Sequence, residues 1–176
     1  MNLTGKTALV TGSTSGIGLG IALKLAEAGA DLILNGFGDA SAALVEVGRH
    51  GHKVGHHGAD VSDPAQIAEL FAYAERDFGG IDILVSNAGI ASSAPIEDTS
   101  LALWNRNMDI LSTGYFLVSR EGFRMLRTQG IGGAVVFVAS KNGLAASTSS
   151  SLYRASMVGL KPPTTARRFC SSRLVR

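Results

Sequence analysis

The chain has 176 residues, of which 45% are apolar and 17% are charged, and its formal net charge is +2. These values predict one globular domain with a hydrophobic core and exclude an intrinsically disordered chain. No apolar run approaches the roughly 18 residues that a membrane helix needs, and the first residues lack the pattern of a secretory signal. Cys170 is the single cysteine, so we expect no internal disulfide, which fits a reducing cytoplasm.

The C-terminal end of the chain is basic. Glu121 is the last acidic residue, and nine Arg or Lys residues follow it. A basic tail can contact nucleic acid or an anionic membrane. This tail lacks the interleaved aromatic residues and the docking motifs of nucleic-acid-binding proteins, so we expect neither partner.

Short apolar runs alternate with longer amphipathic segments along the chain. Gly29 follows the first helical segment as a C-terminal cap, and Asp63 with Pro64 is a typical helix start. Strands are predicted at residues 7–11, 31–35, 53–57, 81–85 and 134–139, and helices at 17–28, 41–49, 64–78 and 101–129. This alternation indicates right-handed βαβ crossovers and a parallel sheet covered on both faces. The predicted fold class is therefore α/β, a doubly wound parallel sheet of about five strands.

A glycine-rich turn lies between the first strand and the first helix. Glycines at such a turn let the backbone approach a pyrophosphate, and the helix that follows presents free N–H groups to the anion. The turn runs Thr11, Gly12, Ser13, Thr14, Ser15, Gly16, Ile17, Gly18. Its position in a strand–turn–helix unit predicts a dinucleotide phosphate site.

The spacing Thr-Gly-x-x-x-Gly-x-Gly resembles that of the short-chain dehydrogenase/reductase family, whose members have a Rossmann-type fold. Three further elements of roughly residues 3–160 carry the same resemblance. Asn87, Ala88 and Gly89 follow the fourth strand, Asp60 and Val61 follow the third, and Ser140 precedes Tyr153 by thirteen residues. The resemblance implies that the first two elements bind the cofactor and that Ser140 and Tyr153 are catalytic.

The end of the second strand bears on the choice of cofactor. A carboxylate there normally binds the adenosine ribose and repels a 2′-phosphate. Here Asn35 is near that position, Phe37 follows it, and Asp39 comes a few residues late. Because no Arg or Lys in the turn or just after this strand offers a partner for a 2′-phosphate, we expect NAD rather than NADP.

The resemblance also implies a catalytic set with two departures. Family members place a Lys four residues after the Tyr, where this chain has Met157. If that ammonium held the Tyr pKa near 7 instead of its usual value of about 10, its loss costs about a thousandfold in phenolate at neutral pH. Relatives usually carry an Asn at the position of Leu111, and Asn107 lies one helical turn earlier as a substitute or as a plain polar helix residue. The resemblance therefore implies impaired turnover with cofactor binding retained.

The region after Tyr153 departs further from the family pattern. Lys161, Pro162 and Pro163 end the helix early, and the residues that follow have no periodic apolar face. We expect a dinucleotide-binding domain at 1–160 that lacks the last two family strands, followed by an irregular basic tail at 161–176. An acid-free, arginine-rich tail is typical of a truncated or frame-shifted gene.

The substrate is indicated only in part. Residues 5–89 resemble bacterial D-3-hydroxybutyrate dehydrogenases, whereas residues 104–120 and 136–144 resemble the dehydrogenase part of bifunctional rhamnulose-phosphate aldolase/alcohol dehydrogenases. A small hydroxy acid or a sugar-derived alcohol is expected. The alternatives are a non-catalytic dinucleotide-binding module and a truncated product without function.

A group of histidines and the long predicted helix are two further features of the sequence. The histidines at 50, 52, 56 and 57 surround the third strand, where we expect them to be solvated rather than to bind a metal. The helix at 104–127 is a subunit interface in relatives, which implies a homo-oligomer, although its apolar stripe can equally belong to the core.

Overall fold

A parallel five-stranded sheet with the strand order β3-β2-β1-β4-β5 forms the centre of the molecule. The computed structural model describes residues 2–92 and 94–140. The strands are β1 (Thr7–Val10), β2 (Asp31–Asn35), β3 (Val54–His57), β4 (Ile83–Ser86) and β5 (Ala134–Phe137). The predicted Rossmann-type α/β fold is confirmed, and each strand lies within about two residues of its predicted bounds.

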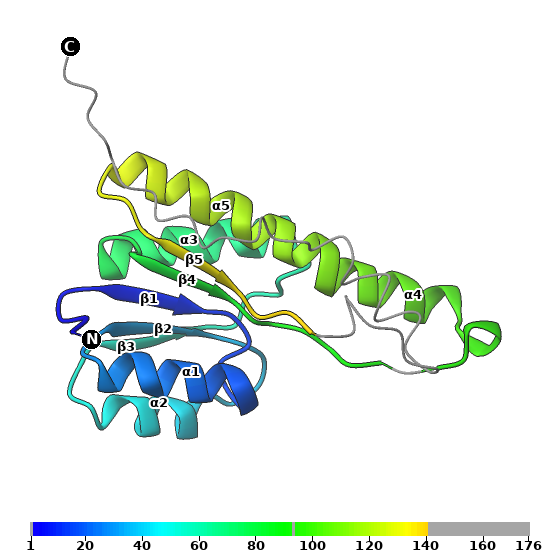
Figure 1. Ribbon diagram of the computed structural model, residues 1–176, viewed down its shortest axis with the longest axis horizontal. Coiled ribbons are helices and arrows are strands. Elements are labelled where there is room, and N and C mark those ends of the chain that lie inside the picture. The colour runs from blue at the N-terminus through cyan, green and yellow to red at the C-terminus, as the bar shows by residue number, and fades with distance from the viewer. Residues whose placement is uncertain (1, 93, 141–176) are drawn as a thin grey trace, which may run out of the picture.

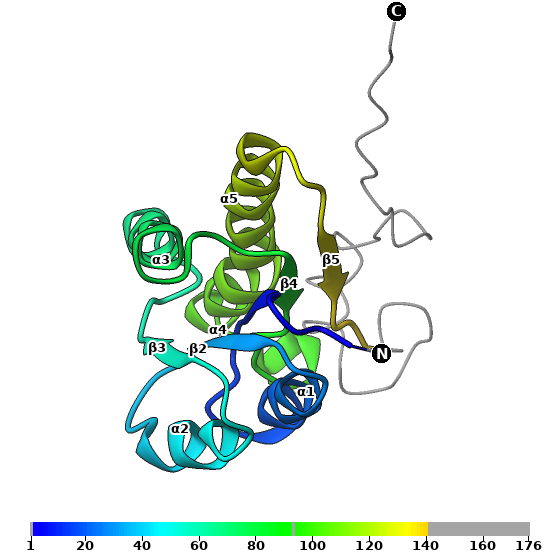
Figure 2. The same cartoon turned by 90° about the vertical axis from the view of Figure 1, so that its left-hand side faces the viewer.

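Helices cover both faces of this sheet (Figure 1). They are α1 (Gly16–Glu27), α2 (Ser41–Gly48), α3 (Pro64–Phe78), α4 (Leu101–Asn107) and α5 (Gly114–Gln129), with a short 3₁₀ helix, η1, at Ile96–Asp98. Helices α1 and α2 lie on one face, and α3 and α5 lie on the other (Figure 2). Among the described residues no helix is long and apolar enough to cross a bilayer.

The core has two parts because the sheet is buried on both sides. Leu9, Ile33 and Leu84 pack toward α3 and α5 and are fully buried. Val10 and Leu32, also fully buried, pack toward α1 and α2. This is why the central strands are continuous apolar runs.

The strand order reverses between β1 and β4. The chain adds β2 and β3 on one side of β1 and then crosses back to place β4 on the other side. In doubly wound sheets a crevice forms at such a reversal, outside the carboxyl ends of the two strands. The residues that follow β1 and β4 therefore lie beside each other at this crevice.

The helix start at Asp63 is confirmed by its contacts. The Asp63 carboxylate accepts hydrogen bonds from the backbone N–H groups of Ala65 and Gln66. A hydrogen bond from the Gln66 side chain, together with these two backbone bonds, lowers the pKa of Asp63 below its usual value. Gly79 ends α3 in the left-handed conformation, as a C-terminal glycine commonly does.

The predicted single helix at 101–129 is interrupted. A π-helical segment, η2 (Met108–Thr113), separates α4 from α5. A π-helix bonds each residue to one five positions away, so side chains beyond it are rotated relative to an uninterrupted α-helix. Periodicity alone could not reveal this change of register, and it alters which side chains face the crevice.

We expect Leu84→Ala to destabilise the fold strongly. Leu84 is fully buried between β4 and the α3–α5 layer, so its truncation leaves a cavity and should cost about 2–5 kcal/mol of unfolding free energy. Val45→Ala on α2 is the matched control, since Val45 is 62% exposed, and it should change stability by less than about 0.5 kcal/mol. Chemical denaturation followed by circular dichroism measures both. Equal effects of the two substitutions would contradict this assignment of the core.

Candidate functional site

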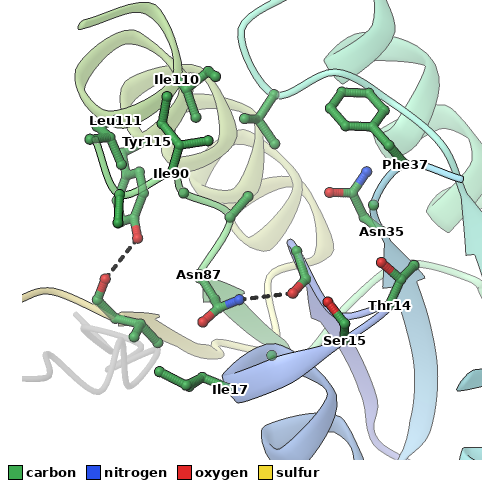
Figure 3. Close-up of a pocket in the computed structure, with 18 of the residues that line it drawn as sticks. Thr14, Ser15, Ile17, Asn35, Phe37, Asn87, Ile90, Ile110, Leu111 and Tyr115 are labelled. Carbon is green, nitrogen blue, oxygen red and sulfur yellow. Dashed lines mark hydrogen bonds between the residues drawn. The ribbon is translucent and has the colours of Figure 1, made fainter. Parts of the chain in front are cut away.

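A pocket of about 800 Å³ lies at the carboxyl ends of the strands, where the strand order reverses. Its volume is within the range of small-molecule and cofactor sites. Its lining comes from six segments of the chain, namely the glycine turn, the end of β2, the loop after β3, the loop after β4, η2 with the start of α5, and the residues that follow β5. Figure 3 shows the side chains that converge on it.

The glycine turn forms the floor of the pocket. Gly12, Thr14, Ser15, Ile17 and Gly18 all line it. Ser15 precedes α1 and makes no capping hydrogen bond within the described part of the chain. The first N–H groups of α1 are therefore open to an anion at the positive end of the helix dipole.

Two glycines of this turn are required by close contacts. Gly12 has φ +64°, and a Cβ there would lie 2.7 Å from the Ala88 Cα. A Cβ at Gly18 would lie 2.1 Å from the Gly12 carbonyl oxygen. Both contacts are with backbone atoms, which have little room to shift, so any side chain would force the turn apart.

Asn87 connects the loop after β4 to this turn. Its Nδ2 donates to the carbonyl oxygens of Thr11 and Gly12 at 2.9 and 3.0 Å. The Thr11 hydroxyl accepts hydrogen bonds from the backbone N–H groups of Asn87 and Ala88 at 2.9 and 3.0 Å. Asn87 and Thr11 thus hold two loops in the geometry that the pocket needs. The sequence singled out Asn87 but gave Thr11 no role, although Thr11 begins the motif.

Asn35 joins three strand ends on the other side of the turn. Its backbone N–H donates to the Ser13 hydroxyl, and its carbonyl accepts from the Ser13 N–H. Its side-chain Nδ2 donates to the carbonyl oxygens of His57 and Ala59 at 3.0 and 2.9 Å. With both Nδ2 hydrogens donated, the amide oxygen of this pocket-lining residue is left as an acceptor. Ser13 is fully buried and does not line the pocket, so its part is to hold Asn35 in place.

Asp60 and Val61 line the pocket after β3. One Asp60 oxygen accepts from the N–H and the hydroxyl of Ser62, which fixes the turn after the strand. Asp60 is the one charged side chain among the described lining residues. No Arg or Lys is among the described residues that line the pocket.

Apolar side chains flank the mouth of the pocket. Ile17 and Phe37 are 71% and 67% exposed and line it from the glycine turn and from the loop after β2. Ile90, Ile110 and Leu111 line its other end (Figure 3). Large apolar groups exposed around a polar floor are typical of a surface that a ligand covers.

Ser140 lines the pocket at the end of β5, as its predicted role requires. Tyr115 holds the backbone that leads from β5 to Ser140, because its hydroxyl donates to the Val138 carbonyl oxygen at 2.7 Å. The Tyr115 ring stacks on Phe137 with centroids 6.1 Å apart. Nothing in the sequence marked Tyr115, because this contact depends on the register of η2. Tyr153 and Met157 lie outside the described residues.

Asn107 does not line the pocket, whereas Leu111 does. The prediction that they share a helix face assumed α-helical spacing, and η2 begins between them. Asn107 is fully buried, its Nδ2 donates to the Leu103 carbonyl, and its Oδ1 has no hydrogen-bond partner in the described residues. The pocket geometry thus gives no support to a catalytic role for Asn107.

The expectation of solvated histidines is wrong for three of the four, since His52, His56 and His57 are partly buried and only His50 is exposed. His56 and His57 are half-buried on β3. The His57 ring packs 5.6 Å from the Tyr73 ring, and burial lowers the pKa of His57 below its usual value. Within residues 2–92 and 94–140, no three His, Cys, Asp or Glu side chains lie where they could share a metal ion.

Comparison with known proteins accords with this geometry. Residues 6–169 match the family model described as short chain dehydrogenase. The chain belongs to this family. It is 49% identical over 160 residues to a D-beta-hydroxybutyrate dehydrogenase of Cupriavidus necator, a match that covers 90% of this chain and 62% of that protein. A second D-beta-hydroxybutyrate dehydrogenase, from Rhizobium meliloti, is 41% identical over 88% of this chain and 61% of its own length.

A solved structure agrees with the fold. The crystal structure of a short-chain type dehydrogenase/reductase from Mycobacterium marinum superposes with a TM-score of 0.86 at 34% identity, covering 90% of this chain and 66% of that one. The chain thus spans somewhat less than two thirds of the length of these relatives. The resemblance to hydroxybutyrate dehydrogenases is confirmed, and that of residues 104–120 and 136–144 to aldolase-linked dehydrogenases stays a prediction.

Gly18→Ala should abolish binding of a nicotinamide dinucleotide. The new methyl group would meet the Gly12 carbonyl and the Asn87 side chain, so the turn cannot close. Gly20→Ala is the matched control, because a Cβ at Gly20 meets nothing within 4 Å. That control should bind normally and gain about 0.5–1 kcal/mol of stability from helix propensity. Fluorescence titration with NADH measures binding, and unchanged binding by Gly18→Ala would place the ligand elsewhere.

Proposed function

We propose that this chain binds NAD in the pocket and is the dinucleotide-binding part of an oxidoreductase that transfers hydride between nicotinamide and a small secondary alcohol or ketone. One observation carries the proposal. A single pocket extends from Asn35 through the glycine turn to Ser140, so a dinucleotide bound along it has its reactive end beside the Ser140 hydroxyl.

The chemistry of the lining fits such a cofactor. The close contacts at Gly12 and Gly18 give a backbone cradle without side chains, which suits a pyrophosphate. The Asn35 amide oxygen and the Asp60 carboxylate are acceptors for hydroxyl and amino hydrogens at the β2–β3 end. The exposed Ile17 and Phe37 side chains offer apolar surface to flat rings.

The bound cofactor supplies the hydride donor or acceptor, and the chain supplies orientation and proton transfer. Ser140 would hold the substrate oxygen by a hydrogen bond from its hydroxyl. Tyr153, by the family resemblance, would exchange the hydroxyl proton as general base or acid. Leu111, Ile110 and Ile90 would exclude water from this end of the pocket.

The substrate class rests on the relatives. Two of them are named D-beta-hydroxybutyrate dehydrogenases, and the later part of the chain resembles dehydrogenases of sugar-derived alcohols. We propose 3-hydroxybutyrate or a sugar-derived alcohol, since both carry a secondary hydroxyl group. We further propose cytoplasmic location, which the single Cys170 favours.

A homo-oligomer is part of the proposal. Phe116 on α5 is 59% exposed, with the Arg120 guanidinium 5.5 Å from the centre of its ring. An exposed aromatic residue on the helix that relatives use as a subunit interface favours self-association.

A second candidate function is non-catalytic dinucleotide binding. Two observations favour it. Met157 occupies the position of the family Lys, and Leu111 lines the pocket at the position where relatives usually carry an Asn. Both positions lie outside the glycine-turn and Asn87–Gly89 motifs of the sequence, so binding would survive while turnover falls.

NADH should bind more tightly than NADPH, by about tenfold or more. A 2′-phosphate near Asn35 would meet the amide oxygen without a cation to pair with, and leaving a charged group unpaired is costly. Phe37→Arg should shift the preference toward NADPH by supplying that cation, while NADH binding weakens because the apolar contact with the Phe37 ring is lost. Parallel fluorescence titrations of both cofactors test this, and tighter NADPH binding by the unaltered chain would overturn the preference for NAD.

Met157→Lys should raise turnover of a hydroxy-acid substrate by about a hundredfold to a thousandfold at neutral pH. The added ammonium would lower the pKa of the Tyr153 hydroxyl from its usual value of about 10 and increase the phenolate fraction. Met157→Leu is the matched control without charge. Steady-state NADH formation with 3-hydroxybutyrate measures the effect, and NADH affinity should stay unchanged. Equal rates for both variants would favour the non-catalytic alternative.

A further inference from the structure

The loop Gly36–Gly38 forms the outer wall of the pocket beyond β2. Its central residue, Phe37, lines the pocket and is 67% exposed, and Gly38 has φ +78°. A loop with glycines on both sides of its one large side chain has little intrinsic stiffness. Phe37 can therefore present a defined surface only if contacts from outside the loop hold it.

His56 provides such a contact. Its ring Nε2 lies 2.9 Å from the Gly36 carbonyl oxygen. A carbonyl oxygen only accepts hydrogen bonds, so Nε2 carries the hydrogen. Among the described residues no other side chain hydrogen-bonds to Gly36, Phe37 or Gly38.

The position of His56 on β3 explains why its ring contacts the Gly36 carbonyl oxygen. β2 and β3 are parallel, with Leu34 opposite His56 and Asn35 opposite His57. The His56 ring therefore extends past the end of β2 to the first residue of the loop. The next residue along β3, His57, accepts the Asn35 side-chain hydrogen bond through its carbonyl.

Thr14 bounds the loop on its other side. A Cβ at Gly36 would lie 2.7 Å from the Thr14 hydroxyl oxygen. Gly36 is thus held between the phosphate turn and His56. A change at His56 alters only one of these two sides, so the glycine turn itself should remain assembled.

We propose that His56 is a positioning residue for the adenosine half of the dinucleotide, because its hydrogen bond to Gly36 holds Phe37 where that ring covers the ligand. This inference rests on the proposed function. The proposal gives a role in binding to His56, which lies on the edge strand β3 and does not itself line the pocket. The chemical group recognised is the adenosine part of NAD, through apolar contact with Phe37.

The test is a double-mutant cycle on the full chain, read by NADH fluorescence titration. His56→Ala should weaken NADH binding about threefold to tenfold, which corresponds to the loss of one net hydrogen bond. His56→Gln should restore affinity to within about twofold, since its amide can donate to the same carbonyl. His50→Ala, at an exposed histidine outside the pocket, is the matched control and should bind as the unaltered chain does.

Phe37→Ala separates a positioning role from a general structural one. If His56 acts through Phe37, His56→Ala should have almost no further effect in the Phe37→Ala background. The full effect of His56→Ala in that background would overturn the inference, and so would equal affinities of His56→Ala and the unaltered chain. Failure of the unaltered chain to bind NADH would instead refute the proposed function.

One measurement needs no substituted protein. Long-range ¹H–¹⁵N spectra of the unaltered chain report which nitrogen of each neutral histidine carries the hydrogen. The inference requires the Nε2–H form of His56 at neutral pH, and the Nδ1–H form would overturn it even if His56→Ala failed to fold.

Discussion

The contact between the turn after β1 and the loop after β4 is the constraint on which the pocket depends. Asn87 donates to two consecutive carbonyl oxygens of the turn, and Thr11 accepts two consecutive N–H groups of the loop. A Cβ at Gly12 would come within 2.7 Å of Ala88. These groups are partly buried backbone donors and acceptors that water cannot fully satisfy, so the contact completes their hydrogen bonding and sets the geometry of the phosphate site.

The parts of the fold and of the pocket that the sequence predicted are those that depend on local sequence properties and on sheet topology. Glycine spacing and strand–helix alternation are local properties, so they predicted the sheet, the glycine turn and the Asn87–Gly89 loop. Asn35, Asp60, Val61 and Ser140 line the pocket because residues at or just after the carboxyl ends of parallel strands gather at one edge of the sheet. Their lining of the pocket follows from topology, whereas their chemical roles remain proposals.

The failures have a different physical origin. Asn107 was considered as a substitute at the Leu111 position because of α-helical spacing, but the π-helical segment that begins at Met108 and contains Leu111 departs from that spacing, and Asn107 does not line the pocket. His56 and His57 were taken as solvated because polar runs at a sheet edge usually are, yet α3 covers the His57 ring with Tyr73. Both features depend on how one element packs against another, and a single sequence carries no direct record of such packing.

The two ends of the pocket differ in how completely the described residues build them. At the β2–β3 end, hydrogen bonds join Asn35 to Ser13, His57 and Ala59, and others join Asp60 to Ser62, with acceptors left toward the pocket. At the other end the described wall is mainly apolar, and Ser140 is the polar side chain nearest the proposed chemistry. Under the proposed function, binding energy and reactivity would therefore reside in separate halves of the site. Under the same proposal, the change at Leu111 affects the end of the pocket near Ser140 while the hydrogen bonds at the β2–β3 end keep their geometry, so dinucleotide binding would persist after the catalytic set has changed.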